Sequence, residues 1–235
     1  MDMSIQERFL GKEAIKKLQS KTVTILGLGG VGSTVAEILA RNGVNLRIVD
    51  KDRIYEKDQP RQTLFTREDI NKFKAKQGKK RLEDINQDVK IKTFHEELIK
   101  DNLLLLESDL IIDTSNNMNL TLLVNEFALS KKIPFIMANY SGSKGHVFTV
   151  DKIQHKKCAC VNCLLDKIKL PPISKEGAYS PTAISVAGFV ISAAIKNLVG
   201  IENIETLVTI DMLKMEVRRN KVEKVKTCTH CKLAK

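Results

Sequence analysis

Four cysteines at two places in the chain are spaced as metal ligands are. Cys160 and Cys163 form one C-x-x-C pair, and Cys228 and Cys231 form a second pair after 64 intervening residues. Two such pairs supply the four thiolates of a tetrahedral structural zinc site. The spacing therefore favours one Zn²⁺ bound by all four, with a redox-active pair as the alternative. Cys158 is left over, as a loop thiol.

A glycine-rich turn between a predicted strand and a predicted helix is typical of nucleotide binding. Gly27, Gly29 and Gly32 match G-x-G-x-x-G, and Gly30 lies in the same turn. The first glycine permits the tight turn, and the second lets a phosphate approach backbone N–H groups at a helix N-terminus. Asp50 ends the next predicted strand, where its carboxylate can accept a ribose hydroxyl. The motif predicts a nucleotide site without distinguishing NAD from ATP, and a merely tight turn is the alternative.

The elements that must position these residues alternate between strand and helix. Apolar, β-branched runs predict strands at 22–26, 46–49, 89–94, 110–112 and 134–139. Helical patterns lie at about 33–41, 69–86, 101–107 and 119–131. Such alternation indicates βαβ units and a parallel sheet. Strands follow without helices at 145–150, and again at 204–211 and 215–218, which predicts antiparallel pairing.

We therefore expect one α/β domain over residues 1–235, with a Rossmann-like mixed sheet. Its N-terminal half is parallel, its C-terminal strands are antiparallel, and helices cover both faces. Residues 156–180 hold two prolines and three cysteines and are predicted to form a long loop. Ser180 is predicted to cap a helix with Pro181 at its first position, and this helix is apolar on every side through Val199, as a core helix is.

Composition limits the classes of protein that this chain can belong to. Its 235 residues are 43% hydrophobic, an ordinary globular value that argues against global disorder. The longest mostly apolar stretch, 181–195, is shorter than the roughly 20 residues of a membrane span. The first residues form a charged, polar lead without the apolar core of a secretory signal. These observations predict a cytoplasmic protein that makes no contact with a membrane.

The formal charge of +11 raises the question of nucleic-acid binding. The basic clusters are scattered and aromatic residues make up only 5% of the chain, so stacking platforms are not evident. We therefore expect no direct contact with nucleic acid. The charge is compatible with a nucleotide or with a small acidic protein as partner.

The loop after Asp50 makes the resemblance to a known family specific. Arg61 follows Asp50 by eleven positions, and Lys74 follows Arg61 by thirteen. In these spacings the sequence resembles the ThiF/MoeB/HesA family of ubiquitin-activating-like adenylyltransferases. The resemblance continues at 113–117, at both cysteine pairs and at the long apolar helix, and it covers residues 21–231.

The resemblance implies Mg²⁺- and ATP-dependent adenylation of the C-terminal glycine of a small ubiquitin-like sulfur-carrier protein that ends in Gly-Gly. Pyrophosphate would be released. Arg61 and Lys74 would clamp the triphosphate, because a forked guanidinium and a point charge suit phosphate oxygens. The glycine turn would receive the nucleotide and Asp50 would hold its ribose. The family also implies a homodimer, in which Arg8 is the candidate to reach the partner's ATP site.

Two positions depart from the family pattern. Asn116 stands where the family has an aspartate that serves magnesium and catalysis, and Asp58 stands where it has an asparagine. One hypothesis is that Asp58 now supplies the metal-facing charge while Asp113 remains as a second carboxylate. The alternative is an impaired enzyme that binds nucleotide poorly.

The crossing segment 166–179 contains no cysteine, and Ser174 lies near the place where some relatives carry a nucleophilic one. A serine is a far weaker nucleophile than a thiolate. The expected product is therefore the acyl-adenylate itself, passed to a separate sulfur donor protein. Two other functions stay open: a catalytically weakened scaffold that binds the same carrier, and a nicotinamide-dependent oxidoreductase. The carrier protein, its pathway and the sulfur donor are not identified by the sequence.

Overall fold

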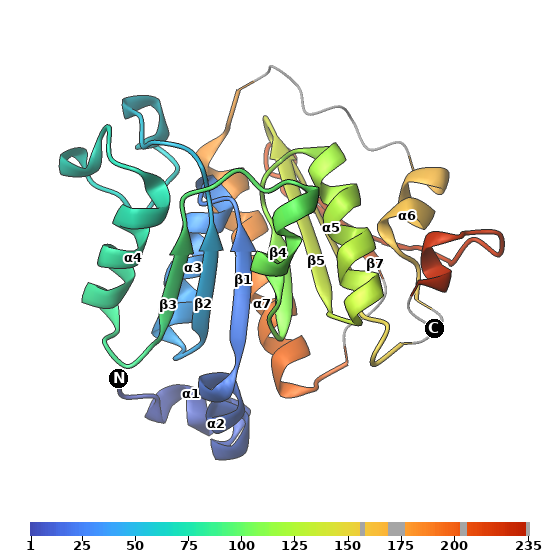
Figure 1. The fold of residues 1–235 in the computed structure, drawn as a ribbon, viewed down its shortest axis with the longest axis horizontal. Helices are drawn as coiled ribbons and strands as arrows, with labels where there is room; N and C mark the ends of the chain where they lie inside the picture. Colours follow the sequence, from blue (N-terminus) through green and yellow to red (C-terminus); the bar gives the residue numbers. More distant parts are fainter. Residues whose placement is uncertain (156–157, 169–176, 203–205, 234–235) are drawn as a thin grey trace.

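One mixed eight-stranded sheet organises the chain in the computed structural model (Figure 1). The structure describes residues 1–155, 158–168, 177–202 and 206–233. The strand order is β3-β2-β1-β4-β5-β6-β7-β8. The strands are β1 Thr22–Leu26, β2 Asn45–Val49, β3 Ile91–Phe94, β4 Leu110–Asp113, β5 Phe135–Ser141, β6 Lys144–Val150, β7 Thr206–Asp211 and β8 Glu216–Lys221. The predicted Rossmann-like mixed sheet is confirmed.

The sheet changes from parallel to antiparallel at β5. Pairs from β3 through β5 are parallel, whereas β5–β6, β6–β7 and β7–β8 are antiparallel. Strand β1 lies between β2 and β4, and its residues 23–26 are all buried. A strand that is buried on both faces is expected to be apolar throughout. Of residues 23–26 only Thr24 is polar. Thr24 donates its hydroxyl hydrogen to the carbonyl of Leu106.

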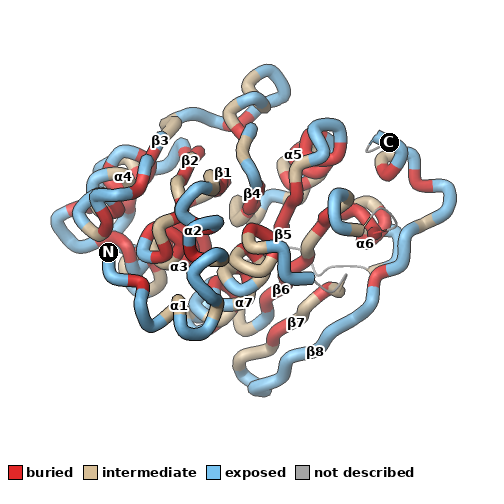
Figure 2. Tube along the Cα trace, turned by 90° about the horizontal axis from the view of Figure 1, so that it is seen from below, coloured by how far each residue is buried: buried red, intermediate tan, exposed pale blue. Residues whose placement is uncertain are grey.

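Helices cover both faces of the sheet, as predicted. On one face pack α2 Lys12–Ser20, α3 Gly30–Arg41, α4 Lys74–Ile85 and α7 Ser180–Val199. On the other lie α5 Met118–Lys131, α6 Val161–Lys167 and the 3₁₀ segment η3 Lys100–Leu106. Shorter 3₁₀ turns are η1 Glu56–Asp58, η2 Arg67–Asp69 and η4 His230–Lys232. In Figure 2 the buried residues follow the inner faces of these layers, and the whole of β8 is exposed at the sheet edge.

The polar lead is helical, which the sequence analysis missed. It forms α1 Ser4–Leu10 and α2, joined at Gly11 with φ of 87°. Ile15 and Leu18, on one side of α2, are buried against the core. Spaced three apart, these two apolar residues are the signal of an amphipathic helix in an otherwise charged segment.

Other local predictions need correction. The long loop predicted at 156–180 contains α6, and the helix predicted from 69 begins only at Lys74. A continuous helix from 69 is excluded because Asn71 has a left-handed backbone with φ of 68°. Ser180 is the first residue of α7 and does not cap it; the cap position is Tyr179.

The helix α7 covers the residues predicted for it, Ser180–Val199, and is therefore longer than the 15-residue apolar stretch within it. Its 20 residues are apolar enough to cross a membrane by length and composition alone. In the fold it packs along α3, β5 and β6. The prediction of a core helix is confirmed for the face on the sheet, whereas Ile184, which is 41% exposed, lies on the other side.

Candidate nucleotide site and cysteine cluster

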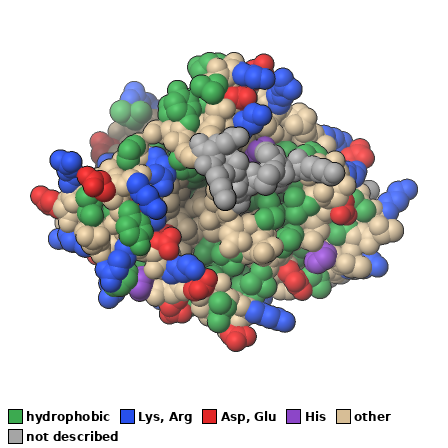
Figure 3. Space-filling model, turned by 90° about the horizontal axis from the view of Figure 1, so that it is seen from above, with side chains coloured by type: hydrophobic (Ala, Val, Ile, Leu, Met, Phe, Trp, Pro, Cys, Tyr) green, Lys and Arg blue, Asp and Glu red, His purple; other side chains and the backbone are tan. Residues whose placement is uncertain are grey.

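The carboxyl ends of β1, β2 and β4 meet at one edge of the sheet and carry the predicted nucleotide residues. Figure 1 shows this edge at the top, above the arrowheads of these strands. Figure 3 looks down on it and shows Lys and Arg side chains alternating with Asp and Glu. In open α/β sheets ligands bind outside the carboxyl ends of the strands, so the fold places the glycine turn where a nucleotide site is expected.

The glycine turn is packed against the loop that follows β4. Gly27 has φ of 86°, which favours glycine, and its carbonyl accepts a hydrogen bond of 2.8 Å from the Thr114 hydroxyl. A Cβ on Gly32 would lie 2.0 Å from the carbonyl oxygen of Gly27 and 2.6 Å from Thr114 Oγ1. Glycine is therefore required at both positions by close backbone approach.

The space in front of this turn is open. A Cβ on Gly29 would meet nothing within 4 Å. Among the described residues, the backbone N–H groups of Gly30, Val31 and Gly32 have no acceptor, because they form the first turn of α3. Unpaired N–H groups at a helix N-terminus attract anions, so this space fits a phosphate.

Asp50 is 8% exposed and holds the glycine turn from the end of β2. Its Oδ2 accepts a hydrogen bond of 2.6 Å from Leu28 N–H, and its Oδ1 accepts one of 2.7 Å from Asp52 N–H. Burial raises the pKa of this carboxyl, against the opposing effects of these N–H groups and of Lys74. Asp50 thus lies at the site, with one backbone hydrogen bond on each oxygen.

The predicted clamp residues come together although they are thirteen positions apart. The loop after β2 folds back on itself: Ile54 N–H bonds to Lys72 O, and Lys74 N–H bonds to Asp52 O at 2.9 Å. Asp58 then lies between the two cations. Its Oδ1 is 2.8 Å from Arg61 Nη2, and its Oδ2 is 3.7 Å from Lys74 Nζ.

Lys74 is a buried cation that forms ion pairs with the carboxylates of Asp52 and Asp58. Its side chain is 8% exposed, and its ammonium lies 3.9 Å from Asp52 Oδ2, beyond hydrogen-bonding distance. In the part of the chain that the structure describes, its three N–H groups make no hydrogen bond. The carboxylates of Asp58 and Asp52 compensate the charge of the buried ammonium, and its N–H groups can still donate to a phosphate oxygen.

Asp113 and Asn116 lie in the loop after β4 and differ in their partners. Asp113 is 1% exposed, and its oxygens accept hydrogen bonds from Thr121 Oγ1 at 2.5 Å and Ser115 N–H at 2.8 Å. Burial raises its pKa. Asn116 has φ of 57°, donates from Nδ2 to Tyr140 O at 3.2 Å, and its buried Oδ1 has no partner among the described residues. Asp113 therefore orders the loop, while Asn116 offers an unused oxygen.

Two residues at the site were missed by the sequence analysis. Asp52 faces Lys74, and Tyr140, at the end of β5, reaches over the glycine turn. Asp52 lies two positions after Asp50 and could have been included on that ground. For Tyr140 the only signal was its position after a predicted parallel strand, and it matched no pattern of the family.

The four paired cysteines form one buried cluster. Sulfur–sulfur distances are 3.8 Å for Cys160–Cys163, 3.7 Å for Cys160–Cys228 and 3.6 Å for Cys163–Cys231. Thiolates around one zinc at about 2.3 Å lie roughly 3.8 Å apart, so the spacing fits a tetrahedral metal site. All five cysteines lie in the described residues and none forms a disulfide. Cys158 is buried outside the cluster of four.

The electrostatics of the cluster favour at least one thiolate. The hydrogen bond from Cys160, aided by the charge of Lys152, lowers the pKa of Cys231 to about 4. The same coupling, together with burial, raises the pKa of Cys160. The cluster joins α6 to the segment at η4, beside α5. Figure 1 shows α5, α6 and the red C-terminal segment at the right of the fold.

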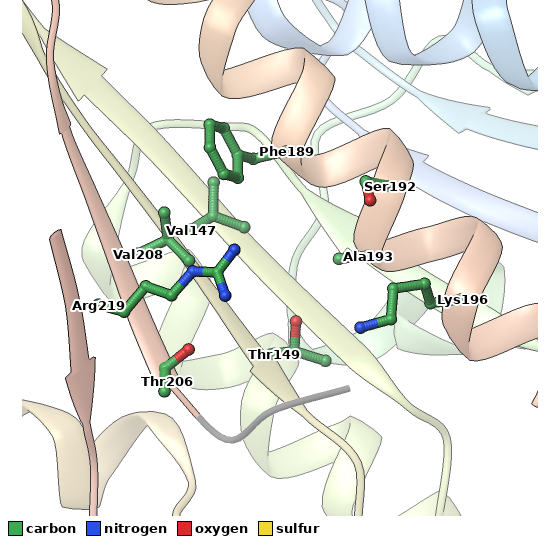
Figure 4. A pocket seen from close by; sticks show the side chains of 9 residues that line it. All are labelled: Val147, Thr149, Phe189, Ser192, Ala193, Lys196, Thr206, Val208 and Arg219. Carbon is green, nitrogen blue, oxygen red and sulfur yellow. The ribbon is translucent and has the colours of Figure 1, made fainter. Parts of the chain in front are cut away.

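A small pocket of about 100 Å³ lies away from the nucleotide residues, between α7 and strands β6 to β8. Figure 4 shows the Arg219 guanidinium from β8 and the Lys196 ammonium from α7 on opposite sides of it. It contains none of the residues predicted from the sequence. Arg8 also lies apart, on α1 at the opposite edge of the sheet in Figure 1.

Comparison of the sequence with known proteins gives a consistent result. The model of the ThiF family matches residues 2–231. The ThiS adenylyltransferase of Bacillus subtilis is 33% identical over 222 residues, which are 91% of this chain and 65% of that protein. A sulfur carrier protein adenylyltransferase of Thermus thermophilus is 28% identical over 94% of this chain and 86% of its own length. This chain thus spans about two thirds of the Bacillus protein.

Solved structures agree on the fold. Escherichia coli MccB, in a structure with succinimide, superposes with a TM-score of 0.84 at 20% identity, over 97% of this chain and 74% of MccB. PaaA superposes with a TM-score of 0.75 at 21% identity, over 95% of this chain and 70% of PaaA.

Proposed function

The chain belongs to the ThiF family, and from that membership we propose that it is an ATP-dependent adenylyltransferase. Its substrate would be the C-terminal glycine of a small ubiquitin-like sulfur-carrier protein ending in Gly-Gly. The observation that carries the proposal is the buried Lys74 ammonium, without a hydrogen bond in the described chain, next to the Arg61–Asp58 pair and the open glycine turn.

In the proposed reaction a carboxylate oxygen of the carrier attacks the α-phosphorus of ATP, and pyrophosphate leaves. This chemistry needs orientation and positive charge where negative charge builds up. The N–H groups of the first turn of α3 would bind phosphate oxygens, and Lys74 and Arg61 would offset the charge of the leaving pyrophosphate. Asp50 would accept a ribose hydroxyl with a remaining lone pair, since it already orients the turn through Leu28.

Magnesium fits the residues present. The buried Asn116 Oδ1 has no hydrogen-bond partner in the described chain, and an amide oxygen is a hard ligand of the kind that Mg²⁺ accepts. Asn116 would hold the ion together with phosphate oxygens, and the ion would neutralise phosphate charge. The contacts of Asp58 favour a role in holding the two cations over a metal-facing role. Its Oδ1 accepts a hydrogen bond from Arg61, and its Oδ2 accepts one from Tyr55 N–H and lies near Lys74.

Zinc is the metal that we propose for the cysteine cluster. Four buried sulfurs within 4.8 Å of one another support this choice. A structural zinc there would hold the segment at 228–231 against α6 and would stabilise the fold without taking part in adenylation.

The remaining expectations stay predictions. They are the homodimer with Arg8 at the partner's ATP site, the separate sulfur donor protein and the cytoplasmic location. Ser174 lies outside the described residues, so its place relative to the site is untested.

The test is ATP–pyrophosphate exchange with a Gly-Gly carrier, followed by mass measurement of the carrier. The proposal expects exchange that depends on carrier and magnesium, and a carrier heavier by one AMP. A carrier that binds without exchange would instead support the scaffold, which Asn116 motivates. Reduction of a nicotinamide cofactor would support an oxidoreductase.

A further inference from the structure

An open groove of about 520 Å³ lies at the end of the sheet opposite the nucleotide residues. It is lined by the first residues of β1 and β2, by the start of β3 and by residues 107–109 before β4. Among the described residues no helix lies in front of β2 and β3 in Figure 1, whereas α5 covers the sheet beside β5. Small-molecule sites usually have volumes of roughly 300–1,000 Å³, so the groove is large enough for a ligand.

Polar side chains make up nearly the whole wall of the groove. Of the ten residues that line it only Leu46 is apolar, and Leu46 is 1% exposed. The hydroxyl residues Ser20, Thr22 and Ser108 lie beside the charged ones. An apolar ligand would gain little here, because it would cover almost no apolar surface of the protein. The wall instead suits a ligand that is charged and rich in hydrogen-bonding groups.

Three cations stand together at one end of the groove. Arg47 on β2 lies opposite Lys92 on β3 in the parallel register, and Lys90 precedes Lys92 by two positions and lines the same groove. Like charges directly opposite each other on neighbouring strands are destabilising. An anion bound between them would remove this repulsion.

The carboxylates of the groove are engaged by other lysines. Asp109 Oδ1 is 2.8 Å from Lys21 Nζ, and Glu107 Oε1 is 2.8 Å from Lys131 Nζ. Asp109 Oδ2 also accepts a hydrogen bond of 2.9 Å from Thr22 N–H. Within the described chain these are the ion pairs of the groove, so the three cations have no carboxylate partner. The carboxylate oxygens keep lone pairs for further donors.

Arg47 is held with the two ends of its guanidinium free. Its Nε donates to the carbonyl of Leu105 at 3.1 Å, and its Cζ lies 5.0 Å from the centre of the Phe94 ring. In the part of the chain that the structure describes, its Nη1 and Nη2 make no hydrogen bond. A guanidinium that is fixed in this way can donate two parallel hydrogen bonds to an acidic group, and its prior order lowers the cost of binding.

We propose that this groove binds a small sugar phosphate. The phosphate would lie among Arg47, Lys90 and Lys92, because a phosphate monoester carries a charge of about −1.5 to −2 and three acceptor oxygens. The sugar hydroxyls would donate to the free lone pairs of Glu107 and Asp109. A nucleotide fits less well, since the lining residues include no aromatic side chain on which a base could stack. The inference does not depend on the proposed adenylation, which uses the opposite end of the sheet.

The test titrates the protein with glucose 6-phosphate and follows the Arg47 Nε–H and the backbone N–H groups of β3 by NMR. We expect saturable shifts, with a Kd that rises at least about tenfold in Arg47→Ala and about threefold in Lys92→Gln. Lys92 is exposed, so its substitution tests the charge without disturbing the fold. Arg219→Ala is the matched control, because it removes an exposed arginine from the strand at the other edge of the sheet, and it should leave the Kd unchanged.

Lys74→Ala separates this groove from the nucleotide site. It should leave the Kd for glucose 6-phosphate unchanged, whereas a sugar phosphate bound at the nucleotide site would lose affinity. Loss of binding in Lys74→Ala, or an unchanged Kd in both Arg47→Ala and Lys92→Gln, would overturn the proposal. Absence of exchange activity would contradict the proposed function and leave this titration as informative as before.

Three further probes test the class of ligand. Inorganic phosphate should bind at least about tenfold more weakly than glucose 6-phosphate, because it lacks the hydroxyl groups, and glucose alone should cause no shifts. Equal affinity for inorganic phosphate and glucose 6-phosphate would overturn the sugar phosphate. Tighter binding of a hexaglutamate peptide would overturn it in favour of an acidic segment of a protein.

Discussion

Asp50 accepts a hydrogen bond of 2.6 Å from the backbone N–H of Leu28, 22 positions earlier in the chain. The end of β2 thereby holds the turn that leaves the end of β1. An acidic residue that a nucleotide fingerprint assigns to the ribose thus also shapes the turn beside it. Substitution of Asp50 would disturb the turn as well as the ribose contact, so sharper tests use other residues.

Gly29 and Gly32 should separate nucleotide binding from folding. We expect Gly29→Ala to leave the melting temperature unchanged and to weaken ATP binding, because its Cβ would enter only open space in front of the turn. Gly32→Ala should lower the melting temperature by several degrees, because its Cβ would lie 2.0 Å from Gly27 O. Thermal melts and ATP titrations check both. Normal ATP affinity in Gly29→Ala would place the phosphates elsewhere.

Lys74→Ala and Arg61→Ala should each lower the rate of ATP–pyrophosphate exchange by on the order of 10²-fold or more, since each removes a cation from the phosphates. Lys196→Ala and Arg219→Ala remove cations from the pocket of Figure 4 and serve as controls with unchanged rates. Exchange at the wild-type rate in both site variants would contradict the clamp.

Asp58→Asn should retain exchange within about tenfold of wild type and keep its magnesium dependence. The single amide oxygen can still accept from Arg61, the contact that holds the guanidinium, but not also from Tyr55 N–H, so one of the two hydrogen bonds of the carboxylate is lost. Rates measured across magnesium concentrations decide the point. Abolition by Asp58→Asn with rescue by Asn116→Asp would instead establish the metal-facing role, and no wild-type exchange with a gain on Asn116→Asp alone would favour the scaffold.

Metal analysis of the purified protein should give about one zinc per chain, lost in Cys228→Ser together with thermal stability. Cys158→Ser is the control, because Cys158 lies outside the cluster and should leave the zinc content unchanged. Hydrogen exchange after chelation should rise first at η4 and α6. Full zinc in Cys228→Ser would show that these four residues are not the ligands.

His146 should make the protein less stable in mild acid. Burial, aided by the charge of Lys144, lowers its pKa from 6.5, so below that pH the unfolded chain binds a proton that the folded protein does not. The free energy of unfolding therefore falls as pH decreases from 6.5 toward the lowered pKa, by up to about 1.4 kcal/mol per pH unit. Urea melts at several pH values should show a shallower slope for His146→Gln. Equal slopes would mean that His146 titrates normally.

The sequence analysis succeeded where neighbouring residues determine the structure. The strand 22–26, its glycines and the following helix are one continuous pattern, and they fold as predicted. Lys74 was placed by the family spacing, and the structure brings it beside Asp58. The cysteine cluster was predicted because two C-x-x-C pairs supply the four thiolates of one tetrahedral metal site.

The sequence analysis failed where tertiary contacts determine whether a segment is helical or where a side chain lies. Ile15 and Leu18 become core residues only because the sheet lies beneath them, so a charged lead concealed a helix. Tyr140 gains its place from Arg61 and Gly30, which lie 79 and 110 positions away and which no local pattern connects to it. Asp113 was expected to be a second carboxylate for the metal; that Thr121 and the Ser115 N–H donate to its two oxygens inside the loop was not indicated by any sequence pattern.

The cysteine cluster also sets an order of events during synthesis of the chain. Cys163 and Cys228 are separated by 64 residues, so at 5–20 residues per second a ribosome needs roughly 3–13 s to pass from the first pair to the second. Throughout that interval the nascent chain carries only two of the four cluster thiols, Cys160 and Cys163, which can hold a metal ion only incompletely. The strands β1 to β6 have by then been translated, so the Rossmann half can pair its strands before the metal site can close.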